Sequence, residues 1–458
     1  MENIPSTTCN RTEYFPYIKL LGKKQMIYPK DIPKLLRARI GALKSEYFES
    51  PKLPSDSIMN ELLEVAYHAS FLTEEGRKLS FRVIFAIESD IAEANTRRGH
   101  SAARPIVFNC PRDFTVAELL RLSPAVEFTQ GLICVAEFKR EKRSKLEIWG
   151  VLDSGSSWWH FMHHNSSHGM PPPNFITISC SAPGQVSVSA QGQIFMTLRG
   201  GAVQEPVSEA LYETPLGAFF DSARKQFHQD VIAGLGVQKY DIEDHDEDFP
   251  QRFYTFFIER LLFHIREKKH GGTIFFVPDY LKHDDTRLLD RISIKYPIDY
   301  DVVWPLLRDS VITHRKYYDL YFPLGDGKKL TRERFSKFTL LDWEKESIEE
   351  SITDCVQFIA GLSGVDGAIV ITDKLRVLGF GAEVIVQSQN LTHVLLPSGT
   401  KRSISDYGTR HRSAFRFCSS LEEAVAFIVS SDGGVKGTLR VDSEVALWPD
   451  INVGGFGI

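Results

Sequence analysis

Hydrophobic and polar residues follow two different periods along the chain, which predicts interleaved helices and strands. Apolar residues three or four apart, the spacing of one helix face, predict helices at 55–70, 207–236, 250–265 and 343–360, with a shorter one at 116–123. Short apolar runs bounded by glycine, proline or charged turns predict strands. These runs lie at 79–87, 131–138, 146–153, 175–180, 186–190, 194–199, 273–278, 365–373, 375–386, 423–431 and 437–441. The alternation favours an α/β or α+β fold, with a mixed central sheet flanked by helices.

An acidic stretch at 241–248 divides the chain. Its run of charges is typical of a solvated linker, and Asp248 and Pro250 are residues that favour a helix start. A length of 458 residues suggests two or three domains. We therefore predict an N-terminal domain at 1–245 and a C-terminal domain at 250–458.

The order of features in the first half recurs in the second. In each half a helix leads into an apolar strand, a turn with proline and aspartate opens a helix, two strands follow, and a further strand enters a closing hairpin. Pro111 and Asp113 match Pro297 and Asp299 in spacing. One hypothesis is that the first α/β domain is a degenerate copy of the second. The alternative is coincidence, and unrelated strand orders in the two halves would refute the copy.

Composition narrows the class of protein. With 43% hydrophobic and 25% charged residues, the chain can bury a substantial core. A net charge of -5 argues against dedicated nucleic-acid binding, but not against a local cationic pocket for a small anion. No apolar run approaches the roughly 18 residues of a membrane span, and no secretory signal is visible. Six scattered cysteines without a CxxC pair fit a reducing compartment, so we expect a cytoplasmic protein.

The first candidate for chemistry is Asp366, which lies between Gly364 and Gly367 at the entry to an apolar strand. Gly367 allows a tight turn or the close approach of a ligand to the backbone. The carboxylate would lie on the rim of the sheet, where it could bind Mg²⁺ or Mn²⁺ or accept a proton from a hydroxyl. Taken alone, an Asp-Gly pair is most often just a turn.

The second candidate is a basic segment, in which a helix is expected to start near Ser413. Backbone amides at a helix start attract phosphate, and arginine forks suit phosphate oxygens. A histidine in the segment adds a donor or a metal ligand. Taken alone, the segment could be a basic surface turn. Its residues are Gly408, Thr409, Arg410, His411 and Arg412.

Together, DGA at 366–368 and GTRHR at 408–412 resemble the signature of the diadenylate cyclases, the DisA-type nucleotidyl cyclases. The resemblance reaches back to about Pro250 and is interrupted by an insertion at about 279–343. In that family two ATP-binding domains meet face to face, and the 3′-hydroxyl of one ATP attacks the α-phosphate of the other to form cyclic di-AMP. The resemblance implies ATP as substrate, Mg²⁺ or Mn²⁺ as cofactor, and a homo-oligomer that is at least a dimer.

The resemblance also implies roles for single residues. Where the family often has Ser-Glu-Glu-Thr-Gly, this chain has Ser430 followed by Asp432, whose side chain is one methylene shorter than glutamate. The expected metal ligands are therefore Asp366 and Asp432. The expected catalytic residues are Asp366, Arg410, His411 and Arg412. The expected ATP-binding residues are Gly367, Ala368, Gly408, Thr409, Ser413 and Ser430.

The first half lacks both motifs. Gln130 and Gly131 stand where the repeated order would place Asp366 and Gly367, so this half is not expected to cyclise ATP. Through EEGRKLSFRVIF and LEIWGVLDSGSSWW it resembles the sensor domains that precede some cyclase domains. The leading hypothesis is a diadenylate cyclase regulated by its N-terminal domain. The alternative is a catalytically silent or differently specific nucleotide sensor with the same fold.

A cluster of histidines in the first half could bind Zn²⁺. No cysteine or acidic residue lies among them, and their spacing matches no common zinc site, so a surface loop is the favoured interpretation. The cluster consists of His160, His163, His164 and His168.

Overall fold

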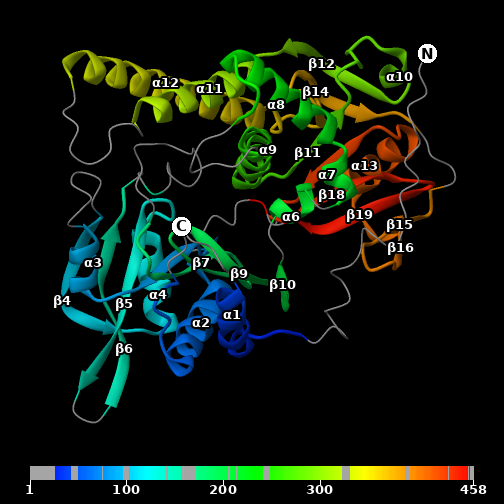
Figure 1. Cartoon of the computed structure of the whole chain (residues 1–458). Coiled ribbons are helices and arrows are strands. Elements are labelled where there is room, and N and C mark those ends of the chain that lie inside the picture. Colours follow the sequence, from blue (N-terminus) through cyan, green and yellow to red (C-terminus); the bar gives the residue numbers. More distant parts are fainter. Residues whose placement is uncertain are drawn as a thin grey trace. The chain divides into compact units, whose positions relative to one another are not determined.

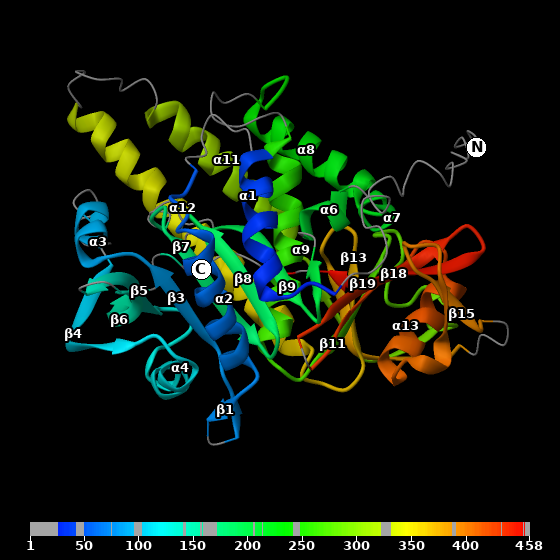
Figure 2. The same ribbon diagram turned by 90° about the horizontal axis from the view of Figure 1, so that it is seen from below.

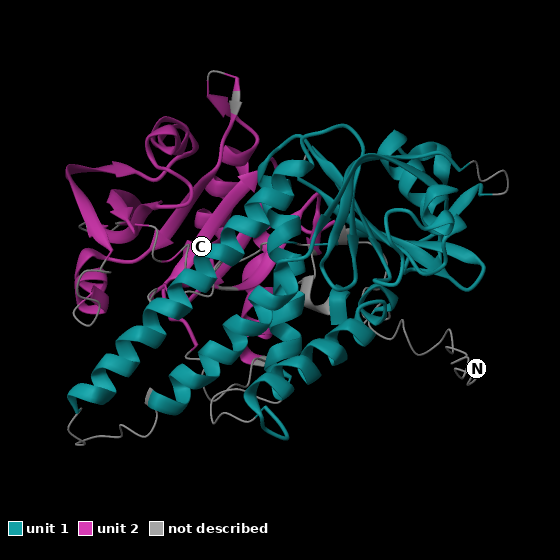
Figure 3. Cartoon of the chain, turned by 90° about the horizontal axis from the view of Figure 1, so that it is seen from above, with its two compact units in different colours: residues 1–24, 206–454 teal, residues 25–205, 455–458 magenta. Residues whose placement is uncertain are grey.

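The chain folds into two compact units, 25–205 and 206–454, which are the N-terminal and C-terminal units below (magenta and teal in Figure 3). The structure is a computed structural model. It describes residues 26–42, 50–74, 76–95, 103–140, 143–155, 158, 172–204, 207–212, 214–240, 248–321, 331–386, 391–431, 433–451 and 453. Each unit contains a mixed sheet with helices packed on it, which confirms the predicted α/β class.

The N-terminal unit is built on an eight-stranded sheet of order β10-β9-β8-β7-β3-β5-β6-β4, in which only β3 and β5 pair in parallel among the described strands (Figure 1). Helices α1 and α2 cover one face and contact β7, β8 and β9, and Leu62, Leu63 and Ala66 share one core cluster with Phe81 and Val83 (Figure 2). Its elements are α1 (Ile32–Ala42), α2 (Asp56–Ser70), β1 (Thr73–Glu74), β2 (Arg77–Lys78), β3 (Phe81–Phe85), α3 (Glu88–Asn95), β4 (Arg104–Asp113), α4 (Val116–Leu122), β5 (Gly131–Arg140), β6 (Arg143–Asp153), β7 (Ile176–Ala182), β8 (Gln185–Ala190), β9 (Gln193–Arg199) and β10 (Ala202–Gln204).

The C-terminal unit has a nine-stranded sheet of order β12-β14-β13-β11-β17-β18-β19-β15-β16. Its elements are α6 (Val207–Tyr212), α7 (Pro215–Ala218), α8 (Asp221–Leu235), α9 (Phe249–Glu267), β11 (Gly272–Val277), α10 (Thr286–Leu289), β12 (Ile292–Tyr300), α11 (Val303–Tyr321), α12 (Arg332–Leu362), β13 (Ala368–Thr372), β14 (Val377–Val384), β15 (His393–Leu395), β16 (Lys401–Ser403), α13 (Thr409–Ser420), β17 (Val425–Val429), β18 (Val435–Val441) and β19 (Glu444–Ile451).

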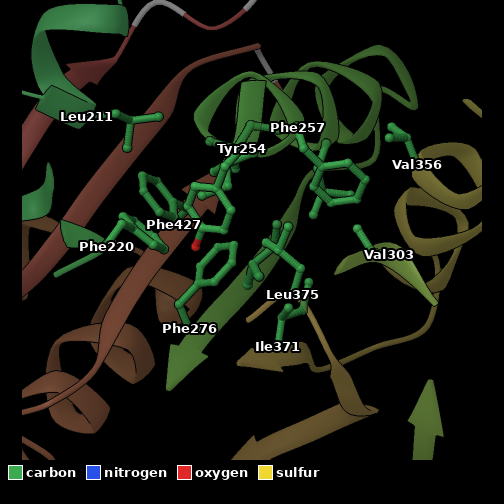
Figure 4. Close-up of a cluster of buried hydrophobic side chains, with 14 of the residues drawn as sticks. Leu211, Phe220, Tyr254, Phe257, Phe276, Val303, Val356, Ile371, Leu375 and Phe427 are labelled. Atoms are coloured by element: carbon green, nitrogen blue, oxygen red, sulfur yellow. The ribbon is translucent and has the colours of Figure 1, made fainter. Parts of the chain in front are cut away.

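Alternate residues of β11 face two different layers of this unit. Ile274 and Phe276 join the main core, to which α8, α9, α11 and α12 contribute, and Figure 4 shows Tyr254 and Phe257 of α9 in that layer. Phe275 faces the opposite side and stacks on Phe417 of α13, with ring centroids 4.3 Å apart. Helix α13 therefore covers the face opposite α9, and its start lies at one end of the strands.

Residues 207–235 pack with the C-terminal unit. Phe220 of this stretch contacts Phe276 at 5.2 Å between ring centroids, and Phe227 contacts Trp304 at 5.2 Å. The predicted domain bounds, 1–245 and 250–458, stay a prediction, but the packing boundary falls near 206.

Helix α12 is longer than the helix predicted at 343–360. Thr331 caps it by accepting a hydrogen bond from the backbone N–H of Arg334. None of its residues before Lys345 is buried, so the added turns carry no apolar stripe that a periodicity could reveal. The predicted insertion at about 279–343 holds α10, β12, α11 and the start of α12, and β12 is a paired strand of the sheet.

The two units share one topology. The order β4-β6-β5-β3-β7-β8-β9 matches β12-β14-β13-β11-β17-β18-β19 in succession along the chain, and each parallel or antiparallel pairing is the same. The two halves therefore have the same strand order, as the copy hypothesis requires.

Two glycines show which residues of the two units correspond to each other in sequence. Gly150 pairs with Cys134 and Val107, and Gly379 pairs with Val370 and Pro297, in both cases beside a bulge. An added Cβ would strike the carbonyl oxygen of Ile106 at Gly150 and that of Tyr296 at Gly379. Because Cys134 and Val370 hold the same place opposite these glycines, Gly131 is the counterpart of Gly367, as predicted.

The predicted match of Pro111 with Pro297 is wrong. Pro297 and Val107 hold the same place opposite their glycines. The bulge that follows is longer in β4 than in β12, so spacing alone misaligned the two prolines.

Candidate functional site

Three loops meet at one end of the C-terminal sheet. Strands β11 and β13 are parallel, and both start at this end, whereas β17 is antiparallel to β11 and finishes there, with Gly272 opposite Val429. The loops before β11, before β13 and after β17 are therefore neighbours. They carry His270 and Gly271, Asp366 and Gly367, and Ser430.

Gly367 can only be glycine in this arrangement. Its φ is +113°, and an added Cβ would lie 2.5 Å from the carbonyl carbon of Gly381. Gly381 itself has a φ of +66°, so two glycines let the start of β13 and strand β14 approach closely. Ala368 follows as a buried residue paired with Thr273 and Ala382.

The three loops form a rim at this end of the sheet. The side chain of Asp366 is exposed on this rim. Within the residues that the structure describes, its carboxylate forms no hydrogen bond or ion pair. Both carboxylate oxygens can therefore accept a ligand, a metal ion or a proton.

Helix α13 begins at Thr409, with Gly408 as its N-cap, and not near Ser413 as predicted. Its first turn is polar and its buried residues start at Ala414, so the apolar pattern alone placed the start too late. Gly408 offers no side-chain acceptor to the amides of the first turn. These amides and the positive end of the helix dipole form an environment that favours an anion.

Arg410 joins the start of α13 to the end of the sheet. Its Nη1 donates to the carbonyl oxygen of His270 at 3.2 Å. An added Cβ on Gly271, which has a φ of +71°, would lie 2.7 Å from this Nη1 and 2.7 Å from the carbonyl oxygen of Val429. Gly271 thus makes room for Arg410, whose side chain stays exposed. The same loop approaches the start of β13, because an added Cβ on Gly364 would lie 3.8 Å from His270 Nε2.

His411 lies in a different environment. Its ring packs 5.6 Å from that of Tyr407 and 6.3 Å from that of Phe415, and both of these rings belong to the small apolar cluster with Val394.

The remaining predicted residues surround this rim. Gly408 and Thr409 are exposed at the helix start, and Arg412 and Ser413 are half-buried. Ser430 lies in a tight turn, where its N–H donates to Gly434 at 2.7 Å and its carbonyl accepts from Gly433 at 2.9 Å. Asp432 lies outside the described residues, as do the four histidines at 160, 163, 164 and 168.

Sequence reasoning missed two residues of the rim. The Gly271–Gly272 doublet before a strand was a visible signal for Gly271, but it looked like an ordinary helix ending. Tyr296 is 43% exposed and stacks on Phe380 at 4.9 Å. Its ring also borders Gly381, next to Asp366. No sequence pattern marks this tyrosine, since its place depends on the pairing of β12 with β14.

The described residues fit a metal that arrives with a phosphate ligand. They contain no group of three or more His, Cys, Asp or Glu side chains that could hold an ion by themselves. A magnesium site commonly uses one or two carboxylates together with substrate phosphates and water. Asp366, exposed beside the start of α13, suits that kind of site.

The helices of the described chain include none that is both long and apolar enough to cross a membrane.

Residues 48–153 match a family described as "Probable sensor domain DACNV". This stretch is similar to that family of sensor domains. The match confirms the sequence likeness to sensor domains, and the matched stretch ends at Asp153, the last residue of β6.

One solved structure that matches is the crystal structure of DacA from Staphylococcus aureus, a double mutant. It is 16% identical, covers 44% of this chain and 88% of its own, and has a TM-score of 0.22. No curated protein matches the chain.

Proposed function

We propose that the C-terminal unit is a diadenylate cyclase, which condenses two ATP into cyclic di-AMP and two pyrophosphates, and that the DACNV domain regulates it. The observation that carries the proposal is the contact of Arg410 with the His270–Gly271 loop. This contact holds a guanidinium and an uncapped helix start at the same end of the sheet as the exposed carboxylate of Asp366.

The charges on this rim suit a nucleotide triphosphate. The first-turn amides of α13 and the side chains of Arg410 and Arg412 would bind phosphate oxygens. Thr409, Ser413 and Ser430 would add hydroxyl donors, while Gly367 and Ala368 would form the floor. His411, packed on Tyr407 and Phe415, would support the start of α13. The exposed ring of Tyr296 offers a surface on which adenine could stack.

Asp366 would act on the reacting groups. A bound Mg²⁺ or Mn²⁺ would offset the phosphate charge, with Asp366 as a ligand and Asp432 as the second expected one. The carboxylate of Asp366 could also orient or deprotonate the 3′-hydroxyl that attacks the α-phosphate of the opposite ATP. The bond from that phosphorus to the bridging oxygen then breaks, and pyrophosphate leaves. A second, reciprocal step closes the ring.

The reaction requires two such rims facing each other, so the active form would be a homo-oligomer and at least a dimer. We propose a cytoplasmic enzyme whose specific activity rises with protein concentration until the dimer is saturated.

The test is to incubate the full chain with ATP and Mg²⁺ or Mn²⁺ and to separate the nucleotides. Asp366→Asn and Arg410→Ala should each lower cyclic di-AMP formation at least about 100-fold, the size of loss seen when one group that stabilises a transition state is removed. Asp354→Asn and Arg416→Ala are matched controls on α12 and α13 and should keep the activity.

Two results would contradict the proposal. Tight ATP binding with no product under either metal would favour the silent sensor. Absence of ATP binding would reject both.

A further inference from the structure

Arg82, in the central strand β3 of the N-terminal unit, is a buried cation without a hydrogen-bond partner among the described residues. Its side chain is 0% exposed, and none of its three guanidinium nitrogens forms a hydrogen bond within that part of the chain. Burial lowers the pKa of Arg82 to about 9, and the charge of Glu127 opposes this only in part. The ring of Phe128 lies 5.8 Å from the guanidinium carbon. Burying an unpaired charge costs several kcal/mol, so a fold keeps one only where something compensates for it.

The other buried arginines of the described chain have partners. Arg224 donates to the carbonyl oxygens of Leu211 at 2.8 Å and Gly217 at 2.9 Å, and it pairs with Asp221. Arg260 donates to Thr353 at 2.9 Å. Although the Nε of Arg260 also has no partner among the described residues, each of these two guanidinium groups forms at least one hydrogen bond, whereas that of Arg82 forms none there.

The face of the sheet on which Arg82 lies holds a second unsatisfied donor. Phe81 and Val83 pack under α2, so Arg82 points to the other face, together with Ile84. Trp158 belongs to the apolar cluster of that face and is 2% exposed, and its indole N–H has no hydrogen-bond partner within the part of the chain that the structure describes. By contrast, the indole N–H of Trp149 in the same cluster donates to Ala86 at 2.8 Å. Two buried donors without acceptors are suited to a ligand rich in oxygen acceptors.

The shared topology shows which residue of the C-terminal unit corresponds to Arg82. Val83 pairs with Ile133 as Ile274 pairs with Ile369, so Arg82 corresponds to Thr273. Thr273 pairs with Ala368, the alanine of the DGA motif. Arg82 therefore lies beside the N-terminal end of β5, at the place where the C-terminal unit carries its proposed nucleotide floor.

We propose that the DACNV domain binds a small phosphate-bearing molecule on this face, with the guanidinium of Arg82 as its main donor. The planar fork of an arginine matches two phosphate oxygens, and the bonds are strong where water is excluded. A nucleotide is the phosphate source favoured by the position, a choice that rests on the function proposed for the C-terminal unit. Free inorganic phosphate offers the same chemistry.

The experiment uses the full chain and hydrogen exchange read at β3 and at the start of β5. The probes are inorganic phosphate, ATP and cyclic di-AMP, each compared with sodium chloride at equal ionic strength. We expect at least one probe to slow exchange at 81–85 and 126–133. Arg82→Met should weaken that probe about 10- to 100-fold, the value of a charge-assisted hydrogen bond of about 1.5–3 kcal/mol. Arg82→Lys keeps the charge and loses the planar fork, so its affinity for the probe should lie between those of the unaltered chain and of Arg82→Met. Arg121→Met, an exposed arginine of the same unit, is the control.

A second readout separates binding from a structural role. Because the side chain of Arg82 forms no hydrogen bond with any described residue, Arg82→Met should unfold at the same temperature as the unaltered chain or higher when no probe is present. A clear loss of stability in that variant would overturn the proposal, as would protection that survives Arg82→Met or protection by none of the three probes.

The double variant Arg410→Ala, Arg412→Ala distinguishes this site from the cyclase site. Protection at β3 and β5 should persist in it, although the proposed cyclase site is disabled. Protection without cyclase activity in the unaltered chain would contradict only the proposed cyclase function. Activity without protection would contradict only the site at Arg82.

Discussion

Gly367→Ala tests whether the DGA motif is first a steric requirement of the fold. A residue with a side chain at a φ of +113° costs about 1–3 kcal/mol of backbone strain. The new Cβ would lie 2.5 Å from the backbone of Gly381, and overpacking of this kind costs about 1–3 kcal/mol more. The sum is roughly 2–6 kcal/mol. For a unit of this size it corresponds to a fall in Tm of roughly 4–24 °C.

Gly408→Ala is the matched control, because it changes the glycine of the other motif. No atom of the described residues lies within 4 Å of a Cβ at that position, and its φ of -67° is ordinary. Its cost should be about 1 kcal/mol or less. Scanning calorimetry of both variants, with ATP turnover measured beside it, gives the comparison. A Gly367→Ala chain that melts within 2 °C of the unaltered one would refute the steric argument.

Three further results are expected. Gly150→Ala and Gly379→Ala should each destabilise their own unit by about 1–3 kcal/mol, measured by limited proteolysis of the two units, because each Cβ would strike a carbonyl oxygen of the neighbouring edge strand. Burial raises the pKa of Asp373 to about 6, above the value of about 4 in the unfolded chain. The protonated carboxyl of Asp373 therefore contributes stability that is fully present below pH 4 and is lost as the pH rises through 6. Compared with Asp373→Asn, the unaltered chain should therefore gain up to about 3 kcal/mol between pH 8 and pH 4, measured by urea unfolding. Cys110, exposed on β4, should react with iodoacetamide in the native protein, whereas burial raises the pKa of the Cys134 thiol and should keep it inert, as peptide mass spectrometry can show.

The sequence predicted those elements whose side chains meet a core with a regular period. The stripe of Phe253, Phe257, Leu261 and Ile265 on α9 is buried as expected, because one apolar face of a long helix is legible without its partners. The first turn of α13 and the first turns of α12 have no such face, and the predicted starts came too late in both helices. Strands β15 and β16 are short and largely polar, and they were not predicted.

The candidate site was predicted as a set of residues but not as an arrangement. Asp366 and Arg410 stood out by residue type and order, whereas their meeting at one end of the sheet depends on β17 running antiparallel to β11. Arg82 shows the converse. It lies in the middle of an apolar run, which predicted a strand correctly, yet only the burial of its guanidinium shows that the position is unusual.

Two sheets of identical strand order in one chain create a hazard during folding. While the chain is being made, a strand of one unit could pair with the partner strand of the other, as happens in strand-exchanged tandem repeats. The central strands oppose such an exchange. If β3 took the place of β11, the long side chain of Arg82 would have to fit in the place of the buried Thr273, beside Ala368 and in the layer of Phe275. The cation in β3 would thus also keep each half of the protein from completing the other's sheet.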